Sequence, residues 1–589
     1  MRVFSDQFFQ KHQKCFLVLL VFLGLLAYTN ALPNQMFWDD EDNILNNVYV
    51  QDWHYFGKYF SENLIAGSGF LSNLWRPMVL FSHSLEWHLW QNWAPGYHFI
   101  NICLHLVNAI LVFLILKQWL KKPFLAWGVA TFFLIHPIQT EAVTYVSGRG
   151  DVLSAFFVLS CLFFYSETKF ILLFLKRRLF YLLALTSYFL ALLTKETTIV
   201  LPLYLLLGEI FVWRERNKLP RSKLTRYSDV TSEEFVSLSH SSVQQAGRYS
   251  ASRNKDKTLH YLTVSFGLLP FFLLSVIYLF LRVTVLNFQN TFNFYNKATF
   301  YTSHLWVRIF TFFKALTLYI GLLFWPMNLH MERILEIPTN FFQTPVAGGF
   351  TMLTLMIGIA LLSWRRQPKY SLAIFWFLVG FIPTSGILVP INSLIYEHWL
   401  YLPMIGFCLF WGLIASNLIH KFPRLKSAIV ALIIGFAVFC LIQTIRRNAD
   451  WRNPITFYQN IIQYNQKSFK AWNNLGMAYA KVGDVKKAFW AYQKAIDLDP
   501  KQESAVPYHN LANLYQSLGQ NEEAIKNYEK ALSIDEKFMF SYFNLVNLYL
   551  EQKKPSEAIK VLRKAAQVFP ENKKIQQMLL WLEKKNIQP

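Results

Sequence analysis

The chain has 589 residues, of which 54% are hydrophobic, and its formal net charge is +22. A mean hydropathy of +0.26 excludes a string of ordinary soluble domains for most of this length. The positive charge does not indicate nucleic-acid binding, because its main sources are short loops between apolar runs, which is typical of cytoplasmic loops in membrane proteins. The principal basic loops are Lys117–Lys122, Lys169–Arg178, Arg214–Lys257, Arg365–Lys369 and Lys421–Lys426.

Apolar runs recur from Lys14 to Thr444, and each is long enough to cross roughly 30 Å of hydrocarbon. Segment 304–326 is apolar but contains Arg308 and Lys314, which favours a re-entrant or interfacial position. Leaving it out gives about eleven spans, places every basic loop on the cytoplasmic side and puts the C-terminus outside. The predicted spans are 15–32, 97–118, 124–141, 151–166, 179–194, 197–213, 259–282, 346–364, 370–389, 399–418 and 427–445.

The first extracytoplasmic loop, predicted over 33–96, contains the acidic run FWDDED at 37–42. Adjacent carboxylates such as Asp39 and Asp40 repel one another, so such a run usually accompanies a nearby cation or a shared function. Two interpretations are open: a catalytic base that deprotonates a hydroxyl acceptor at the membrane surface, or a solvated acidic loop. Metal dependence is open as well, because paired carboxylates also bind Mg²⁺ or Mn²⁺.

The span 97–118 carries a polar stripe. His98, Asn101, His105 and Asn108 are spaced so that they share one face of a helix, within an arc of about 80°. Because polar side chains facing lipid are costly, the stripe must face protein or a water-filled cavity. It indicates either a hydrogen-bonded seam between helices or the wall of an active site.

The second outer connection, HPIQTEAVTYVSGRGD at 136–151, concentrates charged residues between two spans. Arg149 could pair with Asp151 or face a phosphate, and Lys195 with Glu196 is interpreted as a plain ion pair. An anionic leaving group needs cations near the outer membrane boundary to stabilise its developing charge. Further charged candidates on this side are Glu141, Glu397, His398, Arg76, Arg308 and Lys314.

The last part of the chain repeats itself with a period of about 34 residues, which predicts a tetratricopeptide (TPR) α-solenoid over 451–589. The expected repeats cover about 469–502, 505–538 and 539–572, followed by a capping helix. Small residues let the paired helices approach each other, and aromatic residues fill the seams between repeats. The first repeat carries the pattern on Trp472, Leu475, Gly476, Tyr479, Ala488, Tyr492, Ala495 and Pro500.

Seven motifs follow one another along the chain: FWDDED at 37–42, WRP at 75–77, YHFINICLH at 97–105, HPIQTEAVTYVSGRGDVLS at 136–154, TKE at 194–196, LLFWPMNL at 322–329 and YEHWLYLPMIGF at 396–407. In this order, and followed by a TPR tail, they resemble the TMTC-type O-mannosyltransferases, membrane enzymes of the GT-C superfamily that end in TPR arrays. The resemblance implies an all-α fold, with a polytopic GT-C-type helical membrane domain over 1–450 followed by the solenoid.

The resemblance also implies an inverting glycosyltransferase that moves mannose or another hexose from a polyprenyl-phosphate donor to a hydroxyl, expected on Ser or Thr of an extracytoplasmic protein. Asp39 or Asp40 would be the general base, and Arg149, with Arg76 or Lys314, would hold the lipid phosphate. The residues expected around the sugar or acceptor are His98, His105, Glu141, Asp151, Glu397 and His398.

The TPR groove is expected to bind an acceptor protein or peptide, with membrane lipid as the other partner and no nucleic acid. No cofactor is implied with certainty. Three clear repeats are far fewer than animal relatives carry, which favours a bacterial or archaeal cytoplasmic membrane with the solenoid outside, or the lumen of the endoplasmic reticulum in a eukaryote. Two alternatives are a membrane-anchored TPR scaffold and a transporter for lipid-linked sugars, although the spans show none of the internal repeats that many transporters have.

Overall fold

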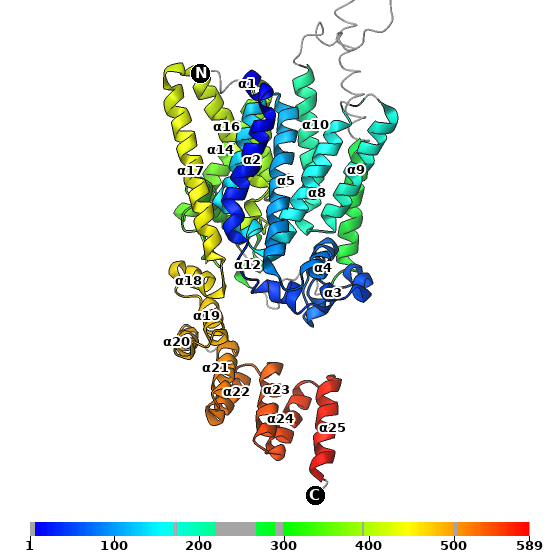
Figure 1. Ribbon diagram of the computed structural model, residues 1–589, viewed down its shortest axis with the longest axis vertical. Helices are drawn as coiled ribbons and strands as arrows, with labels where there is room; N and C mark the ends of the chain where they lie inside the picture. Colours follow the sequence, from blue (N-terminus) through cyan, green and yellow to red (C-terminus); the bar gives the residue numbers. More distant parts are fainter. Residues whose placement is uncertain are drawn as a thin grey trace, which may run out of the picture. The chain divides into compact units, whose positions relative to one another are not determined.

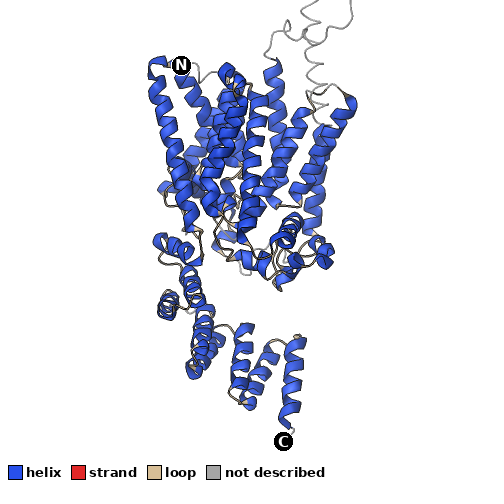
Figure 2. Ribbon diagram, viewed as in Figure 1, coloured by secondary structure: helices blue, strands red, loops and turns tan. Residues whose placement is uncertain are grey.

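The computed structural model describes residues 6–217, 267–288, 299–391 and 394–587, except 170, 172, 334 and 500–503. Within these ranges every regular element is a helix (Figure 2). The predicted basic loop 214–257 lies outside them from residue 218 onward, as does the start of the predicted span 259–282. The chain divides into two compact units: the membrane unit, Met1–Leu329 with Leu335–Trp451, and the tail unit, His330–Ile334 with Arg452–Pro589.

The membrane unit is a bundle of apolar helices (Figure 1). Seven helical stretches among the described residues, those containing α2, α5, α8, α13, α14, α16 and α17, are long and apolar enough to cross a membrane. Together with shorter ones, the main helices of this unit are α2 (Gln13–Tyr28), α5 (Ala94–Leu120), α6 (Pro123–Ile135), α8 (Arg149–Glu167), α9 (Phe174–Leu192), α10 (Leu201–Asn217), the apolar helix Gly267–Val283, α13 (Leu305–Phe324), α14 (Thr344–Arg366), α15 (Pro368–Val379), α16 (Pro403–Lys421) and α17 (Lys426–Asp450).

Proline sets two of the helix boundaries that differ from the predicted ones. Helix α6 begins at Pro123, where the missing N–H costs nothing, and ends at Ile135 instead of continuing to residue 141. The residue before Pro137 is extended, with φ −77° and ψ 131°, because a proline disfavours helical backbone in the residue that precedes it. Helix α15 likewise ends at Val379, ten residues short of the predicted end at 389, just before the Gly380–Pro383 stretch.

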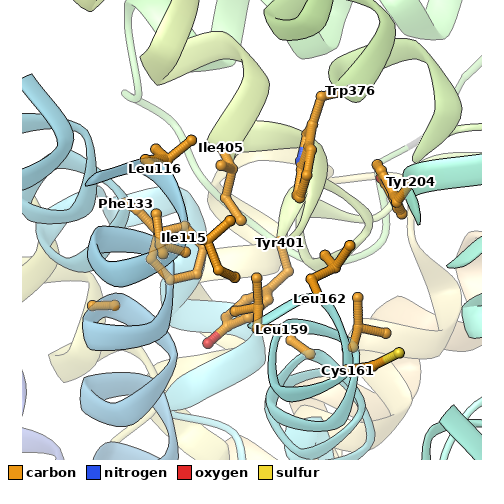
Figure 3. Packing of buried hydrophobic residues seen from close by; sticks show 14 of the residues in the cluster. Ile115, Leu116, Phe133, Leu159, Cys161, Leu162, Tyr204, Trp376, Tyr401 and Ile405 are labelled. Carbon is orange, nitrogen blue, oxygen red and sulfur yellow. The ribbon is translucent and has the colours of Figure 1, made fainter. Parts of the chain in front are cut away.

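Close packing of large side chains fixes the helices that carry the polar residues. Ile115 of α5, Phe133 of α6, Leu159 of α8 and Trp376 of α15 are buried around Tyr401 (Figure 3). Inside a membrane the packing of one helix on another relies on van der Waals contact, because lipid tails are as apolar as the side chains. This cluster therefore holds α5, α6 and α8 in one register.

Polar contacts distinguish the two ends of the bundle. At the basic end, the Lys117 ammonium donates to Gln13 at 2.9 Å, Asp6 accepts from the Phe124 N–H at 3.1 Å, and Arg214 donates to the Trp364 carbonyl. The opposite end, called the acidic end, carries α3 (Val48–Gln51) and α4 (Pro77–Trp90) (Figure 1). It comprises residues 28–96, 136–151, 193–200, 395–402 and 444–451.

Helix α13 lies within segment 304–326, which is predicted not to cross the membrane. Phe313 contacts Phe350 near the start of α14, Phe324 contacts Phe407 near the start of α16, and Trp325, directly after α13, contacts Phe439 in the middle of α17. The helix is long and apolar enough to cross a membrane, so these contacts do not decide between a crossing and the predicted interfacial position. The number of crossings stays a prediction.

The tail unit is a series of antiparallel helix pairs. Gly476 lies directly against Tyr492, and a Cβ there would come within 2.6 Å of the tyrosine ring, so the glycine permits the close approach of the first pair. Gly483 and Gly519 end the first helix of the first two pairs with φ +80° and +72°, and Lys553 takes that position in the third. The helices are α18 (Pro454–Tyr464), α19 (Phe469–Lys481), α20 (Val485–Asp497), α21 (Val506–Ser517), α22 (Asn521–Ile534), α23 (Met539–Glu551), α24 (Pro555–Val568) and α25 (Lys573–Ile587).

Candidate active site at the acidic end

The two adjacent aspartates of the acidic run have different environments. Asp40 is buried, and its Oδ1 accepts hydrogen bonds from the Ser147 N–H at 2.8 Å and the Ser147 hydroxyl at 2.5 Å. Its Oδ2 accepts from the Phe37 N–H at 3.3 Å. Burial raises the pKa of Asp40 to about 7, with the Ser147 hydrogen bonds acting in the opposite direction. Asp39, in contrast, is exposed. Asp40 is therefore an anchored carboxylate, and Asp39 is the accessible one.

The backbone just before the pair is strained. Trp38 has φ +60°, a left-handed conformation that costs a tryptophan on the order of 1–3 kcal/mol. Its indole stacks on Tyr145, with ring centroids 5.6 Å apart. Partial desolvation raises the pKa of Asp39, while the nearby Tyr145 hydroxyl and the Arg76 charge lower it. The turn that presents Asp39 is thus held in place by contacts on both sides of the strained residue.

Two cations lie near this turn. Arg76 forms a bidentate pair with Glu196, at 2.7 Å from Nη2 and 3.3 Å from Nε, and Lys195 pairs with Asp151 at 2.6 Å. The interpretation of Lys195 and Glu196 as a pair with each other is therefore wrong. Burial alone would raise the pKa of Glu196, but the Arg76 guanidinium outweighs it and lowers that pKa to about 2. A Cβ on Gly150 would lie 3.5 Å from Arg76 Nη1 and 3.9 Å from Lys195 Cδ, so this glycine separates the two cations.

Arg149 does not pair with Asp151. Its guanidinium is fully buried and donates to Glu86 Oε1 at 2.5 Å, to Asn101 Oδ1 at 2.5 Å, to the Tyr97 carbonyl at 3.2 Å and to the Ser82 hydroxyl. These partners belong to α4 and α5, so Arg149 ties both helices to the start of α8. With no exposed surface, the side chain offers nothing to a lipid phosphate in this arrangement, contrary to its predicted role.

The polar stripe of α5 forms a hydrogen-bonded seam between helices and does not line an open pocket. His98 Nε2 lies 3.1 Å from the Asn34 carbonyl, and His105 Nδ1 lies 2.6 Å from the Tyr401 hydroxyl. All four stripe residues, His98, Asn101, His105 and Asn108, are buried. Burial with hydrogen-bonding partners is the usual state of polar side chains between membrane helices. The expectation that His98 and His105 line an open pocket is thus not met in this structure.

Three of the predicted pocket residues do come together. Glu141 Oε2 accepts from the Glu397 N–H at 2.8 Å, and Glu141 Oε1 lies 2.5 Å from His398 Nδ1. Glu397 in turn lies 3.7 Å from the guanidinium of Arg447, near the end of α17. Glu141 is buried, while 19% of the His398 side chain is exposed. Lys314, placed with the phosphate ligands by the sequence, donates instead to the Glu336 carbonyl at 2.9 Å.

Sequence reasoning missed the residues that support the acid pair. Ser147 and Tyr145 both lie within the segment 136–151, in which only charged residues were predicted to belong to the site. Asn448 accepts from the Thr144 hydroxyl and Trp451 stacks on Tyr145; both follow the last apolar run, in the sequence RRNADW at 446–451, and that placement of polar and aromatic residues after a span was the available signal.

The described residues contain no group of three or more His, Cys, Asp or Glu side chains arranged to hold a metal ion. At the acid pair, both oxygens of Asp40 already accept hydrogen bonds from protein donors. Only Asp39 of the two has an open carboxylate, which is a poor basis for a divalent site that needs several oxygen ligands.

Two Tetratricopeptide repeat family models match the tail, over residues 467–537 and 509–573. Over a larger part of the chain, a protein O-mannosyl-transferase of Caenorhabditis elegans is 25% identical across 499 residues, covering 83% of this chain and 63% of the relative. TMTC3 of Mus musculus is 24% identical across 509 residues, covering 82% of this chain and 51% of the relative. The chain is a relative of the TMTC-type protein O-mannosyltransferases.

The predicted TMTC resemblance is therefore confirmed, as is the all-helical class with a TPR tail. The chain spans about half to two thirds of the length of these relatives. A further relative, Tmtc1 of Drosophila melanogaster, is 24% identical over 79% of this chain and 59% of its own length. A solved oligosaccharyltransferase from Archaeoglobus fulgidus aligns over 77% of this chain and 56% of that chain, with 12% identity and a TM-score of 0.37, which is too low to establish a common fold.

Proposed function

We propose that this chain is an inverting membrane glycosyltransferase that moves a hexose from a polyprenyl-phosphate donor to a Ser or Thr hydroxyl of a protein. The observation that carries this proposal is the exposed Asp39 carboxylate, held beside the anchored Asp40 and close to Arg76. The mannosyltransferase names of the TMTC relatives support mannose as the first sugar to test.

Asp39 is the general base of the proposed reaction. Its carboxylate takes the proton of the acceptor hydroxyl while the oxygen forms a bond to the anomeric carbon. The bond from that carbon to the phosphate oxygen breaks on the opposite side, so the configuration inverts and polyprenyl phosphate leaves. The raised pKa of Asp39 makes its carboxylate a better proton acceptor near neutral pH than an ordinary aspartate.

Arg76 and Lys195 are the proposed ligands of the lipid phosphate, on either side of Gly150. They are held by Glu196 and Asp151, and 15% of the Arg76 side chain is exposed. Helix α8 begins at this point, so its N-terminal dipole adds a favourable field for an anion. Lys195 takes the role that was predicted for Arg149 and Lys314.

The tail unit is the proposed acceptor-binding part. A groove of about 530 Å³ runs over α18, α19 and α20, and Trp472, Tyr479 and Trp490 line it with several polar side chains. A volume of this size fits a short peptide segment with one or two large side chains. We further propose that the tail and the acid pair share the outer or lumenal side of the membrane, which a reporter fused after Pro589 tests directly: an active cytoplasmic reporter would contradict it.

The decisive experiment uses the full chain in liposomes with labelled polyprenyl-phosphate mannose and, in parallel, polyprenyl-phosphate glucose. Label is followed into a Ser- and Thr-containing acceptor protein. Wild type and Glu62→Gln, a variant in the same outer loop, are expected to transfer one of the sugars, whereas Asp39→Asn loses 10²- to 10⁴-fold in rate, about what a positioned base supplies. No transfer by folded wild type would favour the scaffold alternative, and full activity of Asp39→Asn would overturn the base assignment.

A further inference from the structure

The end of α17 joins three other parts of the acidic end through one asparagine. The Asn448 amide donates to the Ala27 carbonyl and to Asn30 Oδ1, both at 2.8 Å, and its Oδ1 accepts from the Thr144 hydroxyl at 2.6 Å. The Asn448 carbonyl also accepts from the Asn34 amide at 3.0 Å. The side chain is fully buried, so these hydrogen bonds tie the last helix to both ends of the segment that leads into the acidic run and to α7 (Thr140–Val143).

About one turn further along the chain, Trp451 contacts a residue that lies beside the proposed base. Its indole is buried and stacks on Tyr145, with ring centroids 5.1 Å apart and an interplanar angle of 23°. The same tyrosine stacks on the strained Trp38, and its hydroxyl lies beside Asp39. Tyr145 is thus shared between the end of α17 and the turn that presents the proposed base.

We infer that Trp451 and Asn448 are positioning residues for Asp39. A left-handed Trp38 persists only while its surroundings hold it, and Tyr145 is the ring on which it rests. Asn448 fixes Thr144, and Trp451 fixes Tyr145, so the end of α17 sets the position of the whole acid turn without touching a substrate.

The inference rests on the proposed function, and a comparison of two tryptophans that stack in nearly the same geometry tests it. Trp325 stacks on Phe439 of α17 at 5.2 Å and 23°, as Trp451 does on Tyr145 at 5.1 Å and 23°, but Trp325 is exposed and makes its contact in the middle of the helix. Trp451→Ala in the full chain should lower kcat by about 10- to 100-fold, as small misplacements of a reacting group do, while the KM for the lipid donor stays within twofold. Trp325→Ala should leave kcat unchanged.

Two further variants keep the test informative if Trp451→Ala folds poorly. Trp451→Phe retains a ring for Tyr145 and should recover most of kcat, and Thr144→Val removes one hydrogen bond of Asn448 without changing shape and should lower kcat. Melting temperatures of all variants are compared with that of Trp325→Ala. Wild-type kcat in Trp451→Ala or Thr144→Val, or equal losses in Trp451→Ala and Trp325→Ala, would overturn the inference. Activity retained in Asp39→Asn would instead overturn the proposed function.

Discussion

At the basic end of the membrane unit, cationic side chains lie at helix ends and in loops, and the buried Glu209 pairs there with Lys169, which is partly exposed. At the acidic end, charges of both signs lie inside the protein. Burying an ion costs several kcal/mol unless it is paired and hydrogen-bonded, and a helix bundle does not need such groups in order to insert. The buried charged residues of this end are Asp40, Glu86, Glu141, Arg149, Lys195, Glu397 and Arg447. This difference supports the proposal that the acidic end carries the chemistry.

Within that end, two arginines differ in the exposure of their ion pairs, and this difference separates a structural role from the proposed binding role. Arg149 and Glu86 form a closed pair, with 0% and 5% of their side chains exposed. Arg76 and Glu196 form an open pair, with 15% and 40% exposed, and it lies beside Asp39. The closed pair holds helices together, whereas the open pair can exchange part of its contact for a ligand.

The largest effect expected from this comparison is on stability. Arg149→Ala leaves the buried Glu86 without its arginine, with only His83 still in contact with the carboxylate, and should lower the free energy of unfolding by about 3–5 kcal/mol. Lys117→Ala at the basic end removes a single hydrogen bond to Gln13 and should cost about 1 kcal/mol or less. Thermal unfolding of both variants in the same detergent measures the difference, and equal melting temperatures would show that burial does not distinguish the ends.

The next largest effect is expected on the KM for the lipid donor. Arg76→Ala should raise the KM for the polyprenyl-phosphate sugar about 10- to 100-fold, because one hydrogen bond between charged groups contributes about 1.5–3 kcal/mol. Lys117→Ala serves again as the control and should leave the KM unchanged. Initial rates at varied donor concentration give the answer. An unchanged donor KM in Arg76→Ala would mean that Arg76 binds Glu196 but does not belong to the donor site.

Residue patterns predicted much of this architecture. Apolar runs located the membrane helices, the 34-residue period located the tail, and the run at 37–42 located the acid pair. The ion-pair and hydrogen-bond partners of the charged side chains could not be predicted, because they depend on which helices pack together. Arg149 pairs with Glu86, 63 residues away, and not with Asp151 two residues away, since both start α8 but point to different neighbours. The anchoring of Asp40 by Ser147 is of the same kind.

A smaller effect is expected at Gly150, which lies in the space between Arg76 and Lys195. Gly150→Ala adds a methyl group that meets Arg76 and Lys195 at ordinary contact distances of 3.5 and 3.9 Å, so the variant should fold with an unchanged melting temperature. If the lipid phosphate occupies this space, the donor KM should rise severalfold. Gly128→Ala, where a Cβ meets nothing within 4 Å, is the matched control. A normal donor KM in Gly150→Ala would place the phosphate elsewhere.

The smallest effect is a shift in pH dependence, and it separates the roles of the two aspartates. Protonated Asp40 would bring an O–H toward the N–H groups of Ser147 and Phe37, so activity should fall as pH drops through the Asp40 pKa of about 7. The Ser147 hydroxyl lowers that pKa, so Ser147→Ala should raise it and move the acid limb of kcat/KM to higher pH. The shift should stay below about one unit because the Ser147 N–H still donates. An acid limb that does not move would belong to Asp39 itself, and Asp40 would then be an anchor that does not titrate during turnover.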